Sequence, residues 1–242
     1  MKILVADENV NCRHMMVEAL ASVAAEICSA AKGLEAWERL QEKDPPRLAI
    51  LSVTLPGLDG EEICQRVRQA HARDYTYVIL LSGKTDRDNM LEAFEAGVDD
   101  YLLRPISPEE ILARAQVARR FLEKEDRLSA INQQWRTMID NLPFGLACLG
   151  REGEIRRANK VFAEQLGLDL RNFVGKCLRP AILPRMEDYR QLLDHMRGQR
   201  NFDRLEMQMM HHDGSPRRVI VWGRAIGRND ELTFQIITSV KQ

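Results

Sequence analysis

Short apolar segments alternate with longer amphipathic ones along the first part of the chain, and this alternation limits the fold more than any other feature. Apolar residues in the amphipathic segments recur at the three- and four-residue spacing of a helix. The expected strands cover residues 2–6, 25–30, 48–53, 77–81 and 100–103, and the expected helices cover 11–23, 34–41, 61–70 and 88–96. Strands that alternate with helices predict βαβ units and a parallel sheet with helices on both faces. We therefore expect an α/β domain with a doubly wound, five-stranded parallel sheet.

A long helical stretch begins at Pro108 and carries two sets of regularly spaced apolar residues. The first set is Ile111, Ala115, Ala118 and Leu122, and the second is Leu128, Ile131, Trp135, Met138 and Leu142. Each set alternates spacings of three and four, but the two sets are out of register by one residue. We interpret the first set as packing on the preceding domain and the second as a connector that pairs two chains. An ordinary amphipathic helix that packs within one chain is the alternative.

The sequence from Pro143 onward has the pattern of strands and hairpins. The expected strands cover residues 144–149, 154–158, 202–212, 217–225 and 231–239, and the expected helices cover 160–166 and 186–197. Asn159 is expected to cap the first of these helices, and the Asp-Gly-Ser-Pro stretch at 213–216 is a hairpin signal. We therefore predict an α+β domain with an antiparallel sheet. The predicted limits are 1–122 for the first domain, 123–142 for a helical linker and 143–242 for the second domain.

The composition is that of an ordinary globular protein. The net charge is -1, with 29% charged and 45% hydrophobic residues, so bulk charge argues against a nucleic-acid or membrane surface. The five cysteines are scattered and form no Cys-x-x-Cys pair, which argues against a disulfide framework or a structural zinc site. We see no signal peptide and no apolar stretch long enough to span a membrane. These observations predict a cytoplasmic protein.

Polar residues follow four of the predicted strands of the first domain. Asp7 and Glu8 follow the first strand, Ser52 the third, Ser82 the fourth and Arg104 the fifth. Parallel doubly wound sheets bind their ligands beyond the carboxyl ends of the strands. We therefore expect these side chains to converge at one edge of the sheet.

Two motifs add a family resemblance to this pattern. The third strand leads into Leu55-Pro-x-x-Asp59-Gly60, and the fifth lies in the stretch Asp-Asp-Tyr-Leu-Leu-Arg-Pro at 99–105. Residues 1 to about 122 resemble the receiver domains of response regulators, which take a phosphoryl group from a histidine kinase.

The resemblance implies a role for each residue that matches a motif position. Asp7 and Glu8 match the acidic pair that holds a magnesium ion, and Ser52 matches the aspartate that accepts the phosphoryl group. Ser82 matches the hydroxyl that follows the phosphoryl group, Tyr101 matches the aromatic switch, and Arg104 matches the lysine.

Two of these matches depart from the receiver pattern in chemically important ways. Serine cannot form the acyl phosphate, and Ser52 removes one carboxylate from the magnesium shell, which leaves Asp7 and Glu8 as the candidate ligands. Arg104 brings a planar fork in place of a compact ammonium, and it could pair directly with either acidic residue. We therefore expect a self-neutralised pseudo-receiver that works without phosphorylation. Phosphorylation of Ser52 itself, or a regulator that uses another acceptor, is the alternative.

The second part resembles a PAS domain, a small sensory or dimerising fold. The resemblance rests on residues 139–145, 154–159, 165–167, 212–215 and 237–241. Val174-Gly-Lys-Cys177 resembles the flavin-reactive motif of some PAS domains but has the cysteine one position early, and His195 lies where haem-binding members place a ligand.

We favour neither flavin nor haem, and we interpret Met207 and Met209, which share a strand face with Leu205, as core residues rather than a ligand pocket. His211 and His212 are expected to alternate between the two faces of a strand and so not to bind one metal.

Together these features predict a two-domain protein of two-component signal transduction that is not an enzyme. Its expected partners are signalling proteins, such as a histidine kinase or an output protein, and a second copy bound through the helix at 108–142. One alternative is the regulatory amino-terminal part of a larger histidine kinase or diguanylate cyclase. Another is a sensor that binds a ligand in the PAS pocket.

Overall fold

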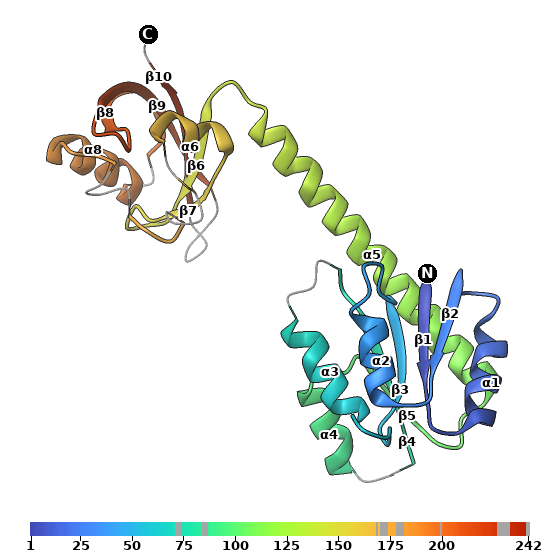
Figure 1. The fold of residues 1–242 in the computed structure, drawn as a ribbon. Helices are drawn as coiled ribbons and strands as arrows, with labels where there is room; N and C mark the ends of the chain where they lie inside the picture. The colour runs from blue at the N-terminus through green and yellow to red at the C-terminus, as the bar shows by residue number, and fades with distance from the viewer. Residues whose placement is uncertain are drawn as a thin grey trace. The chain divides into compact units, whose positions relative to one another are not determined.

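The computed structural model describes residues 1–70, 74–83, 87–167, 169, 174–177, 182–198, 200–226 and 233–240. The chain forms two units, Met1–Ser129 and Ala130–Gln242, and the long helix α5, Pro108–Asp140, joins them (Figure 1). Each unit has its own sheet and its own core, so we describe them separately.

The first unit contains a five-stranded parallel sheet in the order β2-β1-β3-β4-β5. The strands are β1 Lys2–Ala6, β2 Glu26–Ala30, β3 Leu48–Ser52, β4 Tyr77–Ser82 and β5 Asp100–Leu103. The helices before α5 are α1 Val10–Leu20, α2 Gly33–Leu40, α3 Gly60–Gln69 and α4 Arg87–Glu95. The predicted doubly wound α/β fold is confirmed, and its strand order changes direction between β1 and β3.

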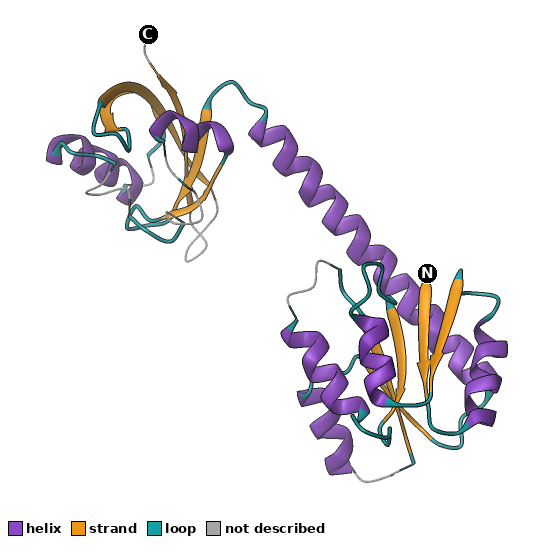
Figure 2. Ribbon diagram, in the orientation of Figure 1, coloured by secondary structure: helices purple, strands orange, loops and turns teal. Residues whose placement is uncertain are grey.

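Side chains on alternate residues of the strands build two separate cores, one on each face of the sheet. Figure 2 shows the helices that flank this sheet. Leu4 and Leu51 face the helices α2, α3 and α4, whereas Ile3 and Ile50 face α1 and α5. Burial on both faces explains why these strands are apolar throughout rather than alternating with polar residues. The sheet is therefore covered on both faces, and only the ends of its strands are left to form a site.

The two apolar sets of helix α5 lie in different surroundings. Ile111, Ala115, Ala118 and Leu122 are buried in the core of the first unit, as predicted. Leu128, Ile131, Trp135 and Met138 are 56%, 40%, 60% and 60% exposed. These four residues therefore lie in solvent within one chain, so the alternative of packing within the chain is not supported for them. Leu142, the last residue of the second set, lies beyond α5 and is partly buried.

The second unit contains a five-stranded antiparallel sheet in the order β7-β6-β10-β9-β8, as predicted. The strands are β6 Gly145–Leu149, β7 Ile155–Ala158, β8 Phe202–Met210, β9 Pro216–Ile226 and β10 Thr233–Val240, and the helices are α6 Lys160–Leu166 and α8 Met186–Arg197. Phe162 of α6 and Leu192 of α8 pack with Met209 and Ile236 of the sheet in one core. Asn159 caps α6, because its side-chain oxygen accepts a hydrogen bond from the amide of Phe162 at 2.9 Å.

Two predicted boundaries within the described residues were wrong by two residues or more, and the others differ by one at most. Helix α1 ends at Leu20 rather than at residue 23, because the amides of Val23 and Ala24 both donate to the Leu20 carbonyl and turn the chain. Strand β8 ends at Met210 rather than at residue 212, so His211 and His212 lie in the hairpin turn. The alternation of faces along a strand therefore does not apply to these two histidines, and their rings lie 4.8 Å apart.

Candidate functional site

Four polar residues of the first unit lie at the carboxyl ends of the strands of its sheet. Asp7 directly follows β1, Ser52 and Ser82 end β3 and β4, and Arg104 directly follows β5. The backbone amide of Arg104 donates to the Ser82 carbonyl at 2.8 Å, which fixes the start of the Arg104 loop against β4. The predicted convergence of strand ends thus places these residues at one edge.

Arg104 is the centre of this site. Its guanidinium donates to the Asp7 carboxylate and, at 3.3 Å, to the Ser52 hydroxyl. It also lies 3.4 Å from the Cys12 sulfur. The Asp7 side chain is 1% exposed and that of Arg104 is 26% exposed, so the pair joins a buried carboxylate to a partly buried cation. The other Asp7 oxygen accepts a hydrogen bond from the amide of Asn9 at 2.8 Å.

Ser52 is buried and held closely on several sides. Its hydroxyl lies 3.4 Å from the hydroxyl of Thr54, a second neighbour besides Arg104. A β-carbon at Gly60 would lie 2.5 Å from the Ser52 carbonyl oxygen, which explains why the motif needs glycine at this position. The start of α3 therefore packs directly against the end of β3.

Glu8 does not share the pocket of Asp7. Glu8 is exposed, and only its backbone carbonyl has a described partner, the guanidinium of Arg13 at 3.1 Å. A magnesium ion prefers several anionic oxygens around it. Here Asp7 is paired with Arg104, Ser52 contributes no carboxylate, and Glu8 is exposed, so these residues do not fit the magnesium site of the receiver pattern.

The two candidate switch residues are both buried. Ser82 lies at the end of β4, and the Tyr101 ring packs in the same core as Leu80 and Val98. The Tyr101 hydroxyl has no hydrogen-bond partner within the part of the chain that the structure describes. The roles that the receiver pattern gives Ser82 and Tyr101 stay predictions.

The sequence interpretation missed the residues of α1 that help to build the site. Asn9 caps α1 through hydrogen bonds from the amides of Asn11 and Cys12 at 2.9 and 3.2 Å, which brings the Cys12 thiol to Arg104. Arg13, which lies one helical turn after Asn9, donates to the Asp7 carbonyl at 2.6 Å. An asparagine just before a helical pattern is a cap signal that could have indicated this arrangement.

A second polar network lies around Asp99, away from Ser52. Its carboxylate accepts hydrogen bonds from Arg68 at 2.6 Å, from the amide of Val78 at 2.7 Å and from the Tyr75 hydroxyl. Burial and the hydrogen bond to Asp99 raise the pKa of Tyr75 above its usual range. The network joins α3 to β4 and the start of β5, so we interpret it as structural.

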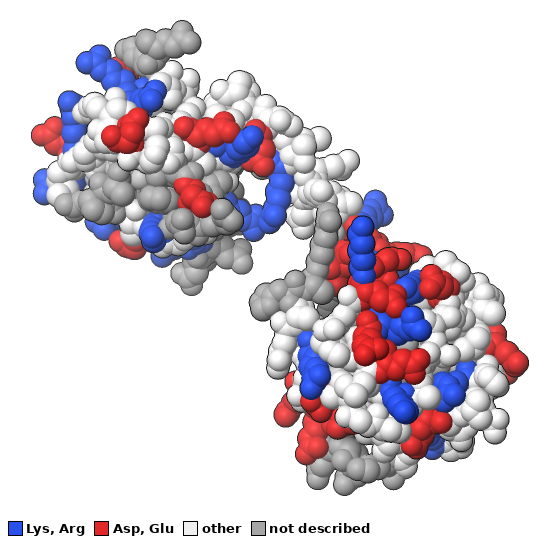
Figure 3. All heavy atoms as spheres, viewed as in Figure 1, with Lys and Arg blue, Asp and Glu red and all other residues white. Residues whose placement is uncertain are grey.

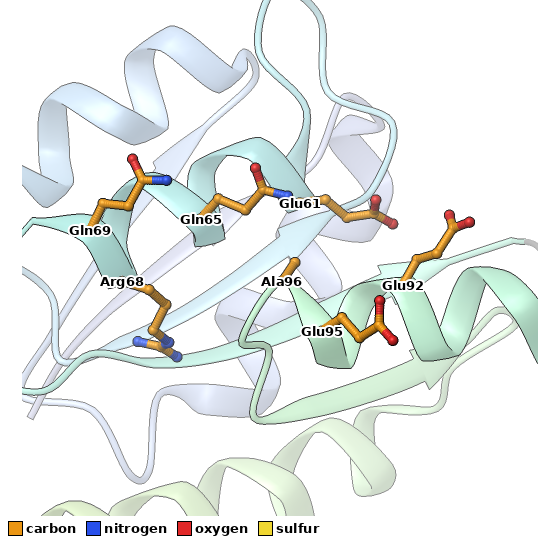
Figure 4. A pocket seen from close by; sticks show the side chains of 7 residues that line it. All are labelled: Glu61, Gln65, Arg68, Gln69, Glu92, Glu95 and Ala96. Atoms are coloured by element: carbon orange, nitrogen blue, oxygen red, sulfur yellow. The ribbon is translucent and has the colours of Figure 1, made fainter.

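A polar hollow of about 530 Å³ lies between α3 and α4 (Figure 4). Its lining consists of Glu61, Gln65, Arg68, Gln69, Glu92, Glu95 and Ala96. None of the predicted site residues takes part in this lining. The hollow is therefore separate from the residues that resemble a phosphorylation site.

The ligand candidates of the second unit take ordinary packing positions. Met207 and Met209 are buried in the core. The Nδ1 atom of His195 lies 2.8 Å from the Gln191 carbonyl, and its ring packs against Phe202 with ring centres 4.9 Å apart. Cys177 is exposed. These contacts account for His195 and the two methionines without a ligand.

Charged residues of both signs are mixed on the face of the molecule that Figure 3 shows. Among the described residues, no group of three or more His, Cys, Asp or Glu side chains is arranged to hold a metal ion. Within the same part of the chain, every helix is too short or too polar to cross a membrane.

The geometry of both units agrees with a comparison to known families. Residues 3–116 match the family model of the response regulator receiver domain, and residues 139–226 match that of the PAS fold. The chain carries a receiver domain followed by a PAS fold. The receiver domain is thus the first unit, and the PAS domain lies in the second.

Curated relatives match the receiver half. The probable transcriptional regulator ycf27 of Porphyridium aerugineum is 32% identical over 143 residues, 59% of this chain and 57% of that protein. The transcriptional regulatory protein ResD of Bacillus subtilis is 35% identical over 115 residues, 48% of this chain and 46% of that protein. The chain spans about half the length of the curated relatives it matches.

Solved structures resemble each half. The response regulator DrrB of Thermotoga maritima is 35% identical with a TM-score of 0.44, over 51% of this chain and 53% of that chain. The PAS domain of an HTR-like protein from Haloarcula marismortui is 21% identical with a TM-score of 0.44, over 49% of this chain and 98% of that chain.

Proposed function

We propose that the receiver domain works without phosphorylation and that the chain transmits signals by binding other proteins. The observation that carries this proposal is the pair of hydrogen bonds that Arg104 donates to Asp7 and to Ser52. The acceptor position holds a hydroxyl instead of a carboxylate, and the cation that would meet a phosphoryl group is already engaged.

The charges of the pocket support this interpretation. An ordinary receiver pocket gathers several carboxylates that repel one another until a cation arrives. Here the one buried carboxylate, Asp7, is bonded by Arg104 and by the amide of Asn9. A charge-assisted hydrogen bond of this kind satisfies the carboxylate without a metal ion. The pocket therefore has little to gain from magnesium.

The test is exposure of the full chain to beryllofluoride or acetyl phosphate with magnesium, followed by NMR spectra and intact mass. We expect no adduct and no spectral change. The matched control is the triple variant Glu8→Asp, Ser52→Asp, Arg104→Lys, which restores the receiver pattern and should respond. A stable adduct on the unaltered chain would contradict the proposal, whether it forms on Ser52 or elsewhere in the pocket.

We further propose that two chains pair through the exposed apolar set of helix α5. Leu128, Ile131, Trp135 and Met138 follow one another at spacings of three, four and three, and all four are exposed within one chain. Such a stripe is the pattern of a two-stranded coiled-coil seam. A second copy of the chain supplies the same stripe and so covers it.

Sedimentation velocity tests this pairing. The double variant Ile131→Glu, Trp135→Glu should sediment as a monomer, because like charges would face each other across the seam. The control variant Ala130→Glu, Gln133→Glu alters exposed positions outside the stripe and should stay dimeric. If the stripe variant remains as dimeric as the unaltered chain, the seam lies elsewhere or does not exist.

The proposed output is protein–protein contact in the cytoplasm rather than catalysis. The relatives ycf27 and ResD are named as transcriptional regulators, and this chain matches them over its receiver half. Because its second half is a PAS fold, we propose that it reaches its target through signalling proteins, such as a histidine kinase or an output protein, and not by contact with nucleic acid.

A further inference from the structure

Two histidine rings of the PAS domain converge on one point in the turn between β8 and β9. His211 and His212 follow directly after β8, and their rings meet edge to face with centres 4.8 Å apart. The point between them lies above Gly167, the residue that ends helix α6. Neither the receiver pattern nor the PAS resemblance accounts for this arrangement.

Distances from Gly167 limit how far apart the two ring nitrogens can lie. A β-carbon at Gly167 would lie 2.3 Å from Nδ1 of His212 and 2.5 Å from Nε2 of His211. The sum of these distances sets an upper limit of 4.8 Å on the separation of the two nitrogens. Two imidazole nitrogens that share a zinc ion at about 2.0–2.1 Å each lie roughly 3–3.5 Å apart. A separation of roughly 3–3.5 Å lies below this limit, so the distances allow the two nitrogens to share one ion on the side of the rings away from the Gly167 backbone.

A carboxylate fixes the orientation of one ring. The Nδ1 atom of His211 lies 3.0 Å from a carboxylate oxygen of Asp213, while the other oxygen accepts a hydrogen bond from the amide of Ser215 at 2.8 Å. The Asp213 amide approaches the same Nδ1 atom at 3.5 Å, so both contacts lie on the Nδ1 side of the ring. The Nε2 atom is the nitrogen that lies beside Gly167. This is how a carboxylate beside a metal-binding histidine orients the ligand.

The backbone holds the turn in place. The amide of His212 donates to the Leu166 carbonyl at 2.9 Å, which ties the turn to the end of α6. The amide of His211 donates to the Ser215 carbonyl at 2.9 Å, and that of Gly214 to the His211 carbonyl at 3.0 Å. Gly167 adopts the left-handed conformation at φ 65°. The two rings are therefore presented by a fixed backbone rather than by a free loop.

We propose that His211 Nε2 and His212 Nδ1 bind one divalent transition-metal ion above Gly167, with Asp213 as a positioning residue. Imidazole suits zinc, copper and nickel, whereas magnesium and calcium prefer oxygen ligands. The described polar contacts of the His211 ring involve its Nδ1 atom, so binding through Nε2 would leave them in place. Two protein ligands leave positions for water or a small anionic ligand.

The first experiment is titration of the tag-free full chain with Zn²⁺ and Ni²⁺ by isothermal calorimetry, with Mg²⁺ as the hard-ion comparison. We expect one Zn²⁺ per chain and no heat from Mg²⁺. The double variant His211→Ala, His212→Ala should lose this binding, whereas His195→Ala, which alters a histidine on α8, should retain it. Asp213→Asn should weaken binding about tenfold, as loss of an orienting carboxylate does at other metal sites.

Two further variants separate the site from other zinc ligands. Cys177→Ser removes an exposed thiol and should leave the stoichiometry unchanged. Gly167→Ala places a β-carbon 2.3 and 2.5 Å from the two nitrogens, which would force the rings to move and should abolish binding, with circular dichroism confirming that the chain still folds. As a direct readout, one equivalent of Zn²⁺ should shift the imidazole ¹⁵N signals of His211 and His212 and leave that of His195 in place.

Some results would overturn the proposal. Equal zinc binding by the unaltered chain and by the His211→Ala, His212→Ala variant would place the ion elsewhere. Binding that disappears in Cys177→Ser or His195→Ala would also place the ion elsewhere. No zinc binding by the unaltered chain would refute the site altogether. None of these results depends on whether the receiver domain is phosphorylated.

Discussion

Replacing Arg104 with alanine removes the cation that neutralises a buried carboxylate, and its cost can be worked out from the contacts of Asp7. The Asp7 side chain is 1% exposed, and after the change only the amide of Asn9 still donates to its carboxylate. Removing one partner of a buried ion pair costs about 3–5 kcal/mol. Because the Arg104 side chain is 26% exposed, water can enter the vacated space, which favours the lower end, about 3 kcal/mol. For a domain of this size that corresponds to a fall in Tm of roughly 10 °C.

Fluorescence of a single tryptophan can follow this change in the receiver domain alone. The chain has 3 tryptophans, of which Trp37 lies in the first unit. In a background with Trp135→Phe and Trp222→Phe, thermal unfolding monitored through Trp37 reports the receiver domain. The control is Arg39→Ala, which breaks an exposed ion pair with Glu42 and should shift Tm far less.

Added magnesium gives this experiment a second readout. In Arg104→Ala the buried carboxylate is left without its cation, so added Mg²⁺ should recover part of the lost Tm, while the unaltered protein should not respond. A fall in Tm no larger than that of Arg39→Ala would refute the reasoning that Arg104 neutralises the pocket. Equal stabilisation of both proteins by Mg²⁺ would refute it as well.

Two other experiments, a substitution and a chemical modification, test the packing inside each unit. Asn159→Ala removes the hydrogen bonds that its side chain makes to Leu146, Phe162, Ile139 and Phe144, at 2.8, 2.9, 2.9 and 3.0 Å, and should lower the free energy of unfolding of the PAS domain by about 2–4 kcal/mol. Chemical denaturation should show this loss, and Asn132→Ala on the exposed face of α5 should show almost none. Burial raises the pKa of the Cys64 thiol to about 11, so at pH 8 about 0.1% of it is thiolate and iodoacetamide should modify it far more slowly than the exposed Cys177. Peptide mass mapping measures both rates, and similar rates would contradict the burial of Cys64.

Local sequence patterns were sufficient for the architecture. The central strands β1, β3 and β4 are short and largely apolar because they are covered on both faces, so their residues could be recognised without knowing any contact. Helices α3 and α8 begin and end within a residue of the prediction, because the helical spacing of their apolar residues is a local property. The shift in register along α5 likewise separated the buried set from the exposed set.

Boundaries and pairings were less accessible, because they depend on atoms distant in the sequence. The sequence interpretation allowed Arg104 to pair with either Asp7 or Glu8, and the structure has it on Asp7 while Glu8 is exposed. Asn159 was expected as a cap only, and its bond to the Ile139 carbonyl at the end of α5 depends on how the chain returns to that helix. The sequence interpretation excluded a convergence of His211 and His212, because it extended the strand to residue 212. The strand ends two residues earlier, at Met210, and the two rings meet in the turn.

The sequence by itself determined the two folds and the edge of the sheet at which Asp7, Ser52, Ser82 and Arg104 gather. These follow from periodicity and residue type, which are local. Only the tertiary structure decided which carboxylate Arg104 neutralises, and that two neighbouring histidines face one point above Gly167. Such outcomes depend on side-chain direction and on close approach between distant segments, and neither is encoded in the spacing of residues along the chain.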